Sequence, residues 1–443
     1  MLERKELIQK VLEAGVVGAG GAGFPTHIKF QAEGIDTYLI NCAECEPLLT
    51  VDQHLMLTQA HRLVETGKKV ASAIGATRLL FGLKQKYAAQ TEALRQAGAE
   101  VAHMGNFYPA GDEVIMIADL IGRTVPEGGL PLQVGVVVNN PETLLSVADA
   151  LDGKPVTHKL VTVGGAVANR GIWRVPIGTP IADLLKAAGG PTISNPVYLD
   201  GGPMTGKYFL QPDYSVSKAT KGLLVVPRDS VMVFHEMMSV EHMLRQAKVG
   251  CIQCSECTFV CSRNLIGYKL EPHKLMRMAA YTRQGLPDIA KQAFLCSECN
   301  LCSGFHACPM KLSPKRLNQV LKGKLREAGI RPDFAKRDIE PQPRRSYRLL
   351  QSSRLERRLG LDRYHGASPY YGDSVLPELL SLKTRQGAGS AVVPEVQEGQ
   401  EVRKGQLLGA PPAGALGSRL HSPVLGVVVR VTADTIEIRP VKV

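Results

Sequence analysis

The sequence has no long apolar run and no secretion signal. Its longest apolar stretches, such as 134–138, are far shorter than the about 20 apolar residues that a membrane-spanning helix requires. The amino terminus shows no basic stretch followed by an apolar core and a cleavage site, and residues 5–14 have the apolar spacing of an amphipathic helix. These absences predict a cytoplasmic protein with no membrane span, a setting that disfavours structural disulfides.

Aromatic residues are scarce where positive charge is dense. Between Lys315 and Arg363, fifteen Lys and Arg stand against six Asp and Glu, which accounts for most of the net charge of +12. A basic tract that binds nucleic acid usually interleaves aromatic residues, whereas this segment has few and carries proline. We therefore favour a connecting arm that docks on an acidic surface, and expect no nucleic-acid partner.

The length and composition predict a globular protein of several domains. The chain has 443 residues, of which 44% are hydrophobic, so about 150 residues per domain predicts about three domains. Strands expected at 37–40, 78–83 and 134–138 alternate with helices at 57–74 and 88–97. This alternation predicts an open α/β domain.

The expected secondary structure changes twice in the second half of the chain. Short strands expected at 159–165, 173–176 and 197–202 surround a helix at 181–188, which is the order of a β-grasp unit. Strands expected at 396–400, 404–409 and 422–426 predict a small closed β domain. The predicted domains are 1–152 (α/β), 153–235 (β-grasp), 236–325 (helical, with the cysteine groups), 326–380 (basic arm) and 381–443 (all-β).

Eight of the ten cysteines lie in two tight groups. The first group, Cys251, Cys254, Cys257 and Cys261, has the spacing of a bacterial ferredoxin, and the second, Cys296, Cys299, Cys302 and Cys308, repeats it with a two-residue insertion. This pattern predicts two [4Fe-4S] clusters. In two-cluster ferredoxins the fourth cysteine binds the other cluster, so we assign Cys308 to the first group and Cys261 to the second. The longer spacing before Cys308 leaves open which cysteine closes which cluster.

Two other interpretations of the cysteines are weaker. Tetrahedral zinc sites use two C-x-x-C knuckles each and do not need a third cysteine at the same spacing. Cys42 and Cys45 form a lone C-x-x-C after a strand, which is typical of a thiol redox pair or of two small buried residues beside a cofactor. We favour the second of these for Cys42 and Cys45.

A glycine-rich loop at 18–23 contains a formal G-x-G-x-x-G. The dinucleotide-binding fingerprint requires a strand before these glycines, whereas here a helix precedes them. A simple Rossmann site is therefore disfavoured. The glycines still allow backbone amides to approach a phosphate or a flavin ring closely, and Lys29 can neutralise a phosphate.

Four motifs in order resemble the FMN and NADH site of the 51 kDa flavoprotein subunit of respiratory complex I. They lie at 18–29, 41–47, 108–113 and 139–143. The resemblance implies a flavin domain in which FMN is held by Gly18, Gly20, Lys29, Asn41, Asn139, Asn140 and Thr143. It also implies that Tyr108 lines the flavin pocket and that Phe24 stacks on the nicotinamide nucleotide, with Glu46 and Glu113 near it.

The predicted cofactor-binding set is completed by Gly21, Gly23, Glu44 and Gly111. Two positions depart from the family pattern: Ala43 stands where complex I has an acidic residue, and Asp112 replaces a glutamate. Hydride transfer to a flavin needs no general acid from the protein, so no catalytic side chain is assigned.

The later domains carry further resemblances. Residues 199–206 look like the end of a soluble-ligand-binding β-grasp (SLBB) domain, which is either a ligand-binding unit or a structural spacer. The last domain looks like a barrel-sandwich hybrid of the lipoyl and biotinyl type, but its hairpin at 421–427 lacks a lysine that could be modified. The RnfC component of the Rnf complex is similar over nearly the whole length, except that it carries the sandwich domain before the flavin domain.

This domain order resembles the cobalamin reductases of propanediol-utilisation microcompartments over essentially the whole chain. The resemblance implies an iron–sulfur flavoprotein that takes electrons from NADH through FMN and two [4Fe-4S] clusters to a corrinoid. It further implies an adenosyltransferase partner, shell or lumen proteins as neighbours, and a place inside a bacterial microcompartment. The alternatives are an Rnf-type electron-input component of a membrane complex and a scaffold with vestigial cofactor sites, which the intact cysteine groups disfavour.

Overall fold

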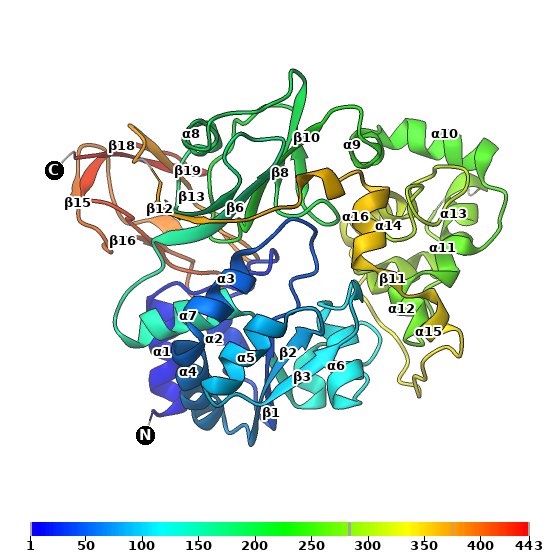
Figure 1. Ribbon diagram of the computed structural model, residues 1–443, viewed down its shortest axis with the longest axis horizontal. Coiled ribbons are helices and arrows are strands. Elements are labelled where there is room, and N and C mark those ends of the chain that lie inside the picture. The colour runs from blue at the N-terminus through cyan, green and yellow to red at the C-terminus, as the bar shows by residue number, and fades with distance from the viewer. Residues whose placement is uncertain (1, 282–284, 375, 442–443) are drawn as a thin grey trace.

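The structure is a computed structural model that describes residues 2–281, 285–374 and 376–441. The predicted outer limits of the first and last domains, residues 1 and 443, lie outside these ranges. Figure 1 shows two sheet-containing domains one above the other, a helical domain on the right and a small all-β domain on the left that holds the end of the chain. Among the described helices none is both long and apolar enough to cross a lipid bilayer.

The first domain is built on a parallel sheet with strand order β3–β2–β1–β5. The strands are β1 (Thr37–Asn41), β2 (Arg78–Lys84), β3 (Val101–Met104) and β5 (Val136–Asn139). The helices are α1 (Arg4–Glu13), α2 (Thr26–Lys29), α3 (Val51–Thr58), α4 (Ala60–Ile74), α5 (Ala88–Gln96), α6 (Glu113–Ile121) and α7 (Pro141–Leu151), with a 3-10 turn at Pro131–Val134. This arrangement confirms the predicted α/β class.

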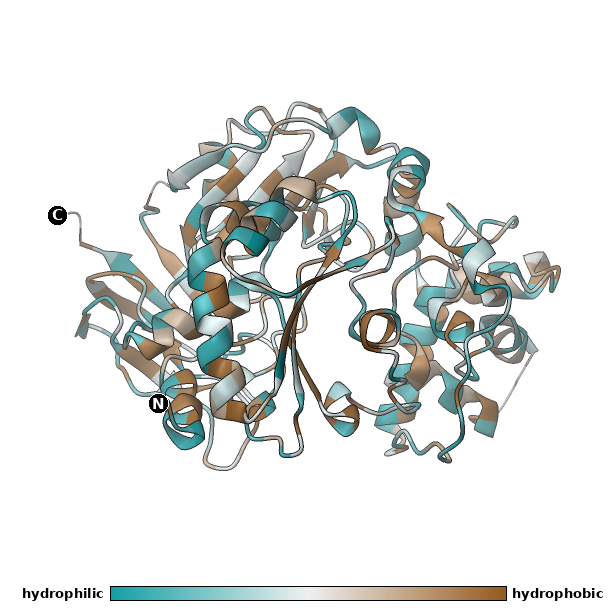
Figure 2. Ribbon diagram, turned by 60° about the horizontal axis from the view of Figure 1, so that its bottom comes forward, coloured by the Kyte–Doolittle hydropathy of each residue, from teal (hydrophilic) through white to brown (hydrophobic). Residues whose placement is uncertain are grey.

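Apolar residues on both faces explain why this sheet is buried between helices. On β1, Tyr38 and Ile40 pack into one core with α1, α4 and α7, whereas Leu39 packs into a second core that includes α6. Parallel strands covered on both faces are apolar nearly throughout, and they appear brown in Figure 2. The single helix predicted at 57–74 is wrong: the chain leaves helical geometry at Gln59, which separates α3 from α4.

The second domain is a six-stranded sheet with one helix, as the β-grasp prediction requires. The strand order is β12–β7–β6–β10–β8–β9. The elements are β6 (His158–Gly165), β7 (Gly171–Pro176), α8 (Ile181–Ala187), β8 (Pro196–Asp200), β9 (Lys207–Phe209) and β10 (Gly222–Pro227). Its edge strand β12 (Tyr370–Asp373) comes from the basic arm and pairs with β7.

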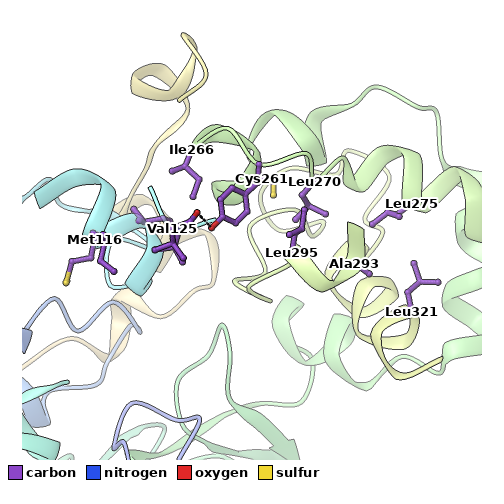
Figure 3. Close-up of a cluster of buried hydrophobic side chains, with 14 of the residues drawn as sticks. Met116, Val125, Cys261, Ile266, Leu270, Leu275, Ala293, Leu295 and Leu321 are labelled. Carbon is purple, nitrogen blue, oxygen red and sulfur yellow. Dashed lines mark hydrogen bonds between the residues drawn. The ribbon is translucent and has the colours of Figure 1, made fainter. Parts of the chain in front are cut away.

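The third domain is helical and shares its core with the first. Its helices are α9 (Val231–Met237), α10 (Val240–Gly250), α11 (Glu256–Phe259), α12 (Ser262–Leu265), α13 (Pro272–Tyr281) and α14 (Pro314–Glu327), with a 3-10 segment at Asp288–Leu295. One apolar cluster extends from Met116 and Val125 in the first domain to Leu275 and Leu321 in the third, as Figure 3 shows. The two domains are therefore packed as one unit.

The basic arm is folded onto the other domains. It contains α15 (Arg345–Arg348), β11 (Leu350–Gln351), α16 (Ser352–Arg358) and a 3-10 turn at Asp362–Tyr364. Strand β11 pairs with β4 (Phe107–Tyr108) of the first domain, and the arm then crosses to the second sheet (Figure 1). Its arginines form ion pairs with acidic residues of the same chain: Arg337 with Glu127, Arg345 with Asp119, and Arg348 with Glu256.

Arg337 is expected to be the main anchor of the arm. It donates to both carboxylate oxygens of Glu127, at 2.7 and 3.1 Å, and the Glu127 side chain is only 5% exposed. Removing one partner of a buried ion pair costs about 3–5 kcal/mol because the other charge stays buried. We expect Arg337→Ala to speed proteolytic cleavage within 331–345 by roughly tenfold or more. Arg331→Ala, at an exposed position, is the matched control; equal cleavage of both variants would contradict the assignment.

The last domain consists of two small sheets, but its strands are displaced from those predicted. They are β13 (Leu380–Lys383), β14 (Val393–Pro394), β15 (Glu401–Val402), β16 (Leu407–Ala410), β17 (Leu420–His421), β18 (Gly426–Val431) and β19 (Thr435–Pro440). The predicted strand at 396–400 is a turn, in which Gly399 has a φ of +83°. Of the strand predicted at 422–426, residues 422–425 form the connection from β17 to β18, and Gly426 is the first residue of β18. The prediction of a small all-β domain is confirmed, whereas these two strands are corrected.

Candidate functional site

A cleft opens where the carboxyl ends of β1 and β5 meet the second and third domains. Seven of the residues predicted to bind cofactor line it: Gly20, Asn41, Glu44, Glu46, Tyr108, Gly111 and Asn140. The remaining lining residues were not in that predicted set: Cys45, Asp52, Pro109, Asp112, Thr205, Lys221, Ser297 and Cys299. The cleft therefore draws side chains from three domains.

The glycine loop is held against the start of α7. The backbone N–H of Ala19 donates to Thr143 Oγ1 at 2.9 Å, and Asn140 caps α7 by accepting from the N–H of Thr143 at 2.9 Å. The Nδ2 group of Asn140 is buried and has no hydrogen-bond partner among the described residues. An unpaired buried donor calls for an acceptor, which the polar groups of FMN supply. The residues at this end of the cleft therefore fit the flavin implied by the motifs.

The far end of the glycine loop contacts the last domain. Gly23 has a φ of +61°, and a Cβ there would lie 2.7 Å from Gly387 Cα. The N–H of Ala388 donates to the carbonyl of Gly23 at 3.1 Å. As expected from the sequence, the loop follows a helix, α1, rather than a strand. The all-β domain thus helps to fix the loop.

Several predicted residues lie outside the lining of the cleft: Gly18, Gly21, Gly23, Phe24, Lys29, Glu113, Asn139 and Thr143. Lys29 Nζ donates to the Val138 carbonyl at 2.8 Å and pairs with Glu113 at 3.2 Å. Asn139 accepts from the Tyr38 hydroxyl at 3.1 Å. The contact of these eight residues with FMN or NADH stays a prediction.

Glu46 connects the first domain to the SLBB-like segment. Its carboxylate accepts from the N–H of Met204 at 2.9 Å and from the Thr205 hydroxyl at 2.6 Å. Burial raises the pKa of Glu46, and the hydrogen bonds from Thr205 and Met204 oppose that change. A Cβ at Gly202 would collide with Glu46, so the glycine pair of that segment allows this close approach.

A second contact between these domains is ionic. Lys221 Nζ lies 2.6 Å from Glu44 Oε2 and 2.5 Å from Asp52 Oδ2, and all three side chains are at most 10% exposed. Burial raises the pKa of Asp52 to about 6, and the Lys221 ammonium opposes this change. Sequence reasoning missed Lys221 and Asp52 because neither lies in a motif.

Asp112 joins the first domain to the cysteine-rich domain. One carboxylate oxygen caps α6 by accepting from the N–H of Val114 at 3.0 Å, and the other accepts from Arg263 at 2.9 Å. Arg263 follows Cys261 by two residues. The ion pair is 10–13% exposed, so it holds the start of α6 against the second cysteine group.

The eight cysteines surround two separate cavities. Cys251, Cys254, Cys257 and Cys308 line one, and Cys261, Cys296, Cys299 and Cys302 line the other. This grouping is the crossed-over one of the two pairings that the sequence left open. The ligand assignment itself remains a proposal.

The two three-cysteine loops have the same backbone. Gln253 and Ser255 in the first loop, and Glu298 and Asn300 in the second, all have φ between +59° and +67°. Non-glycine residues in this region cost about 1–3 kcal/mol each and persist only where the surroundings require them. In the second loop the N–H of Glu298 donates to Cys296 Sγ at 3.3 Å. Such loops fit the ligation of a cubane cluster.

The thiols of each group affect one another electrostatically. Burial, and then the neighbouring Cys308, Cys254 and Cys251, raise the pKa of Cys257 to about 12. Four thiols held this close need a cationic centre to become thiolates. No three His, Cys, Asp or Glu side chains in the described part of the chain are close enough to hold a single metal ion. A cubane does not require this, since each thiolate binds its own iron.

Cys299 and Ser297 belong to both sites. They line the flavin cleft and also the cavity of the second cysteine group. The two sites therefore share a wall. By contrast, Cys254 of the first group is exposed at the surface, and Ile252 and Met310 beside it are 61% and 44% exposed.

Cys45 lies in the cleft as well. Its Sγ accepts from the N–H of Gly111, and burial raises its pKa to about 11. Cys42 is fully buried in the core of the first domain. A thiol with a raised pKa is a poor nucleophile, which favours a structural role over thiol redox chemistry for both cysteines; Cys45 lines the cleft, whereas Cys42 does not.

Comparison with known proteins matches four domain families along the chain. They are the Nuo51 FMN-binding domain at residues 11–149, the SLBB domain at 160–207, the 4Fe-4S dicluster domain at 250–313 and the RnfC barrel-sandwich hybrid domain at 372–439. FMN and [4Fe-4S] clusters are therefore the cofactors of this domain arrangement, and the order confirms the predicted fold class.

Two curated relatives match along their whole length. The cobalamin reductase PduS of Citrobacter freundii is 40% identical over 443 residues, covering 99% of this chain and 97% of that protein. The protein of the same name from Salmonella typhimurium is 39% identical over 441 residues, covering 99% and 97%. A component of the Na⁺-translocating ferredoxin:NAD⁺ oxidoreductase complex of Acetobacterium woodii is 34% identical over 265 residues, covering 58% of this chain and 57% of that one.

A solved structure shares the fold. A chain of the NAD⁺-reducing [NiFe]-hydrogenase in its H₂-reduced state superposes with a TM-score of 0.50 at 23% identity, covering 75% of this chain and 64% of that one. At this identity the likeness concerns the fold alone.

Proposed function

This chain belongs to the family of the cobalamin reductase PduS, and from this premise we propose that it oxidises NADH and delivers the electrons to a corrinoid. It is an iron–sulfur flavoprotein by its domains. When bound, FMN accepts two electrons as a hydride and releases them singly, and each [4Fe-4S] cluster carries one electron.

The observation that carries the proposal is the shared wall between the cleft and the second cysteine group. Cys299 lines both, so a flavin in the cleft is adjacent to a thiol that we assign as a cluster ligand. Asn140 supplies an unpaired donor for the flavin, and Gly20, where the nearest atom to an added Cβ is Asn140 Nδ2 at 4.0 Å, leaves room for its approach. The first cysteine group, with the exposed Cys254, is the side on which we place the acceptor.

The chain's own residues hold the walls of the cleft together. Glu46 is held by Met204 and Thr205, Glu44 and Asp52 by Lys221, and Asp112 by Arg263. These contacts join the first domain to the second and third. We keep Phe24, with Glu46 and Glu113 near it, as the proposed contact for the nicotinamide nucleotide.

The family also supports a proposal for the setting. The relatives are named cobalamin reductases, so we propose that the product corrinoid passes to an adenosyltransferase and that the protein works inside a propanediol-utilisation microcompartment. The Rnf-type alternative is less well supported, because the match to the Acetobacterium woodii complex covers only 58% of this chain, whereas the PduS match covers 99%.

The proposal is tested by anaerobic purification, counting of flavin and iron, and stopped-flow reduction by NADH. With aquacobalamin as acceptor we expect electron transfer at least about tenfold faster than with the same concentration of free reduced FMN, which corresponds to about 1.4 kcal/mol of barrier. An artificial dye serves as the control acceptor. If the dye is reduced rapidly but aquacobalamin no faster than by free flavin, the corrinoid is not the acceptor.

A further inference from the structure

Lys221 is the cation that the second domain contributes to the flavin cleft. It lies directly before β10, and its side chain is 10% exposed. Its ammonium contacts two carboxylates of the first domain, at 2.6 Å from Glu44 and 2.5 Å from Asp52. All three residues line the cleft, so this cation and its partners border the space in which we propose that FMN binds.

The charges that line the cleft are unequal. Among the described lining residues, the carboxylates are Glu44, Glu46, Asp52 and Asp112, and the only ammonium or guanidinium is that of Lys221. Asp112 is paired with Arg263 from outside the lining, and Glu46 is held by neutral donors. Lys221 is therefore the cation that offsets the remaining negative charge where the flavin ring is reduced.

A structural ion pair alone does not account for this geometry. Joining two domains requires one carboxylate for one ammonium, as at Lys159 and Glu142, where Nζ and Oε2 lie 2.7 Å apart. At Lys221 two carboxylates converge on one ammonium beside an open cleft. Glu46 already joins the same two domains.

We propose that Lys221 is an electrostatic positioning residue for FMN, by which the SLBB domain favours the reduced flavin. Reduction adds negative charge to the ring, and buried carboxylates oppose this change, whereas a buried ammonium favours it. The proposal rests on the proposed function only in placing FMN in this cleft. If the proposal holds, the second domain is not a structural spacer, because it supplies part of the flavin site.

The test measures the midpoint potential of bound FMN by anaerobic redox titration. Lys221→Met should lower the potential and Asp52→Asn should raise it, because the two changes remove opposite charges from one ion cluster. We expect each change to alter the ratio of affinities for reduced and oxidised FMN by about tenfold, which is about 30 mV for a two-electron couple. Lys221→Arg, which keeps the positive charge, should have the same potential as the wild type.

Lys159→Met is the matched control. Lys159 is a buried lysine of the same sheet, 4% exposed and paired with Glu142, but it does not line the flavin cleft. It should lower the thermal midpoint of unfolding as much as Lys221→Met does, without changing the flavin potential. If Lys221→Met does not retain FMN, the flavin potentials of Lys221→Arg and Asp52→Asn test the proposal instead.

The possible results distinguish a failure of this proposal from a failure of the proposed function. If Lys221 is purely structural, Lys221→Met and Asp52→Asn will have lower thermal midpoints of unfolding, and their flavin potentials will either equal that of the wild type or shift in the same direction. Either result would overturn the inference. A wild-type protein that binds no FMN would instead overturn the proposed function. A wild type that is reduced by NADH, with unchanged potentials in the variants, rejects only the role of Lys221.

Discussion

Cys308→Ala is expected to remove one [4Fe-4S] cluster and leave the other intact. Cys308 lines a cavity with Cys251, Cys254 and Cys257, although it is nearer in sequence to the second cysteine group. Loss of one of four thiolates from a cubane site prevents stable assembly. We expect the purified variant to hold about half the iron and sulfide of the wild type, and its remaining cluster signal, seen by low-temperature paramagnetic resonance, to be reducible by NADH.

Cys261→Ala is the complementary variant. Cys261 lines the cavity of the second group, whose Cys299 also borders the flavin cleft. It should again halve the iron content, but its remaining cluster should be reduced much more slowly by NADH while dithionite still reduces it. Cys42→Ala, at a buried cysteine outside both groups, should keep all of the iron. If Cys308→Ala instead eliminates the cluster beside the flavin cleft, the crossed-over assignment is wrong.

The two cysteine groups could be predicted from sequence because most of their geometry is local. In each loop the first three thiols lie within seven residues, and the left-handed residues fall at the same positions, as Gln253 and Glu298 show. The pairing of Cys308 and Cys261 depends on how α13 and α14 bring the loops together. Spacing alone left that pairing open, and analogy with ferredoxins proposed the crossed-over pairing, with which the cysteines that line the two cavities agree.

The electrostatics of the cleft could not be predicted, because they arise between domains. Lys221 and Asp52 are 169 residues apart, and a single lysine before a strand has no pattern that distinguishes it from a surface residue. Thr205 lies in a segment that the sequence marked as SLBB-like, but its bond to Glu46 depends on the placement of the second sheet over the first. Sequence motifs contain residues that are close along the chain, whereas this site forms only when the domains pack together.

The strand positions of the last domain could not be predicted for a different reason. The sequence predicts a strand at 396–400, yet Gly399 at a φ of +83° makes this segment a turn. In a domain with strands as short as two residues, such as β14 and β15, turn geometry decides the boundaries more than side-chain alternation does. The all-β class of the domain is therefore easier to predict from sequence than the boundaries of its strands.

Gly111→Ala is expected to weaken FMN binding while leaving the chain folded. Gly111 lines the cleft, and a Cβ there would lie 2.6 Å from Cys45 Sγ, closer than such atoms approach. Asn41 donates to the Gly111 carbonyl at 2.8 Å, so a shift of this backbone also moves Asn41. Overpacking of this kind costs about 1–3 kcal/mol, and we expect an affinity loss of roughly tenfold or more, measured by flavin fluorescence on refilling the apoprotein.

Removing the colliding sulfur should rescue that variant. In Gly111→Ala/Cys45→Ala the nearest atoms to the new Cβ would be Ala43 Cβ at 3.4 Å and Asn41 Oδ1 at 3.6 Å, which are ordinary contacts. FMN affinity should return close to that of Cys45→Ala alone, which should itself bind and reduce FMN normally if the thiol has no redox role. Gly366→Ala, with no atom within 4 Å of its Cβ, controls for added bulk. A double variant as defective as Gly111→Ala would show that the cleft is limited by something other than the Cys45 contact, and a redox-inactive Cys45→Ala would return the thiol to the mechanism.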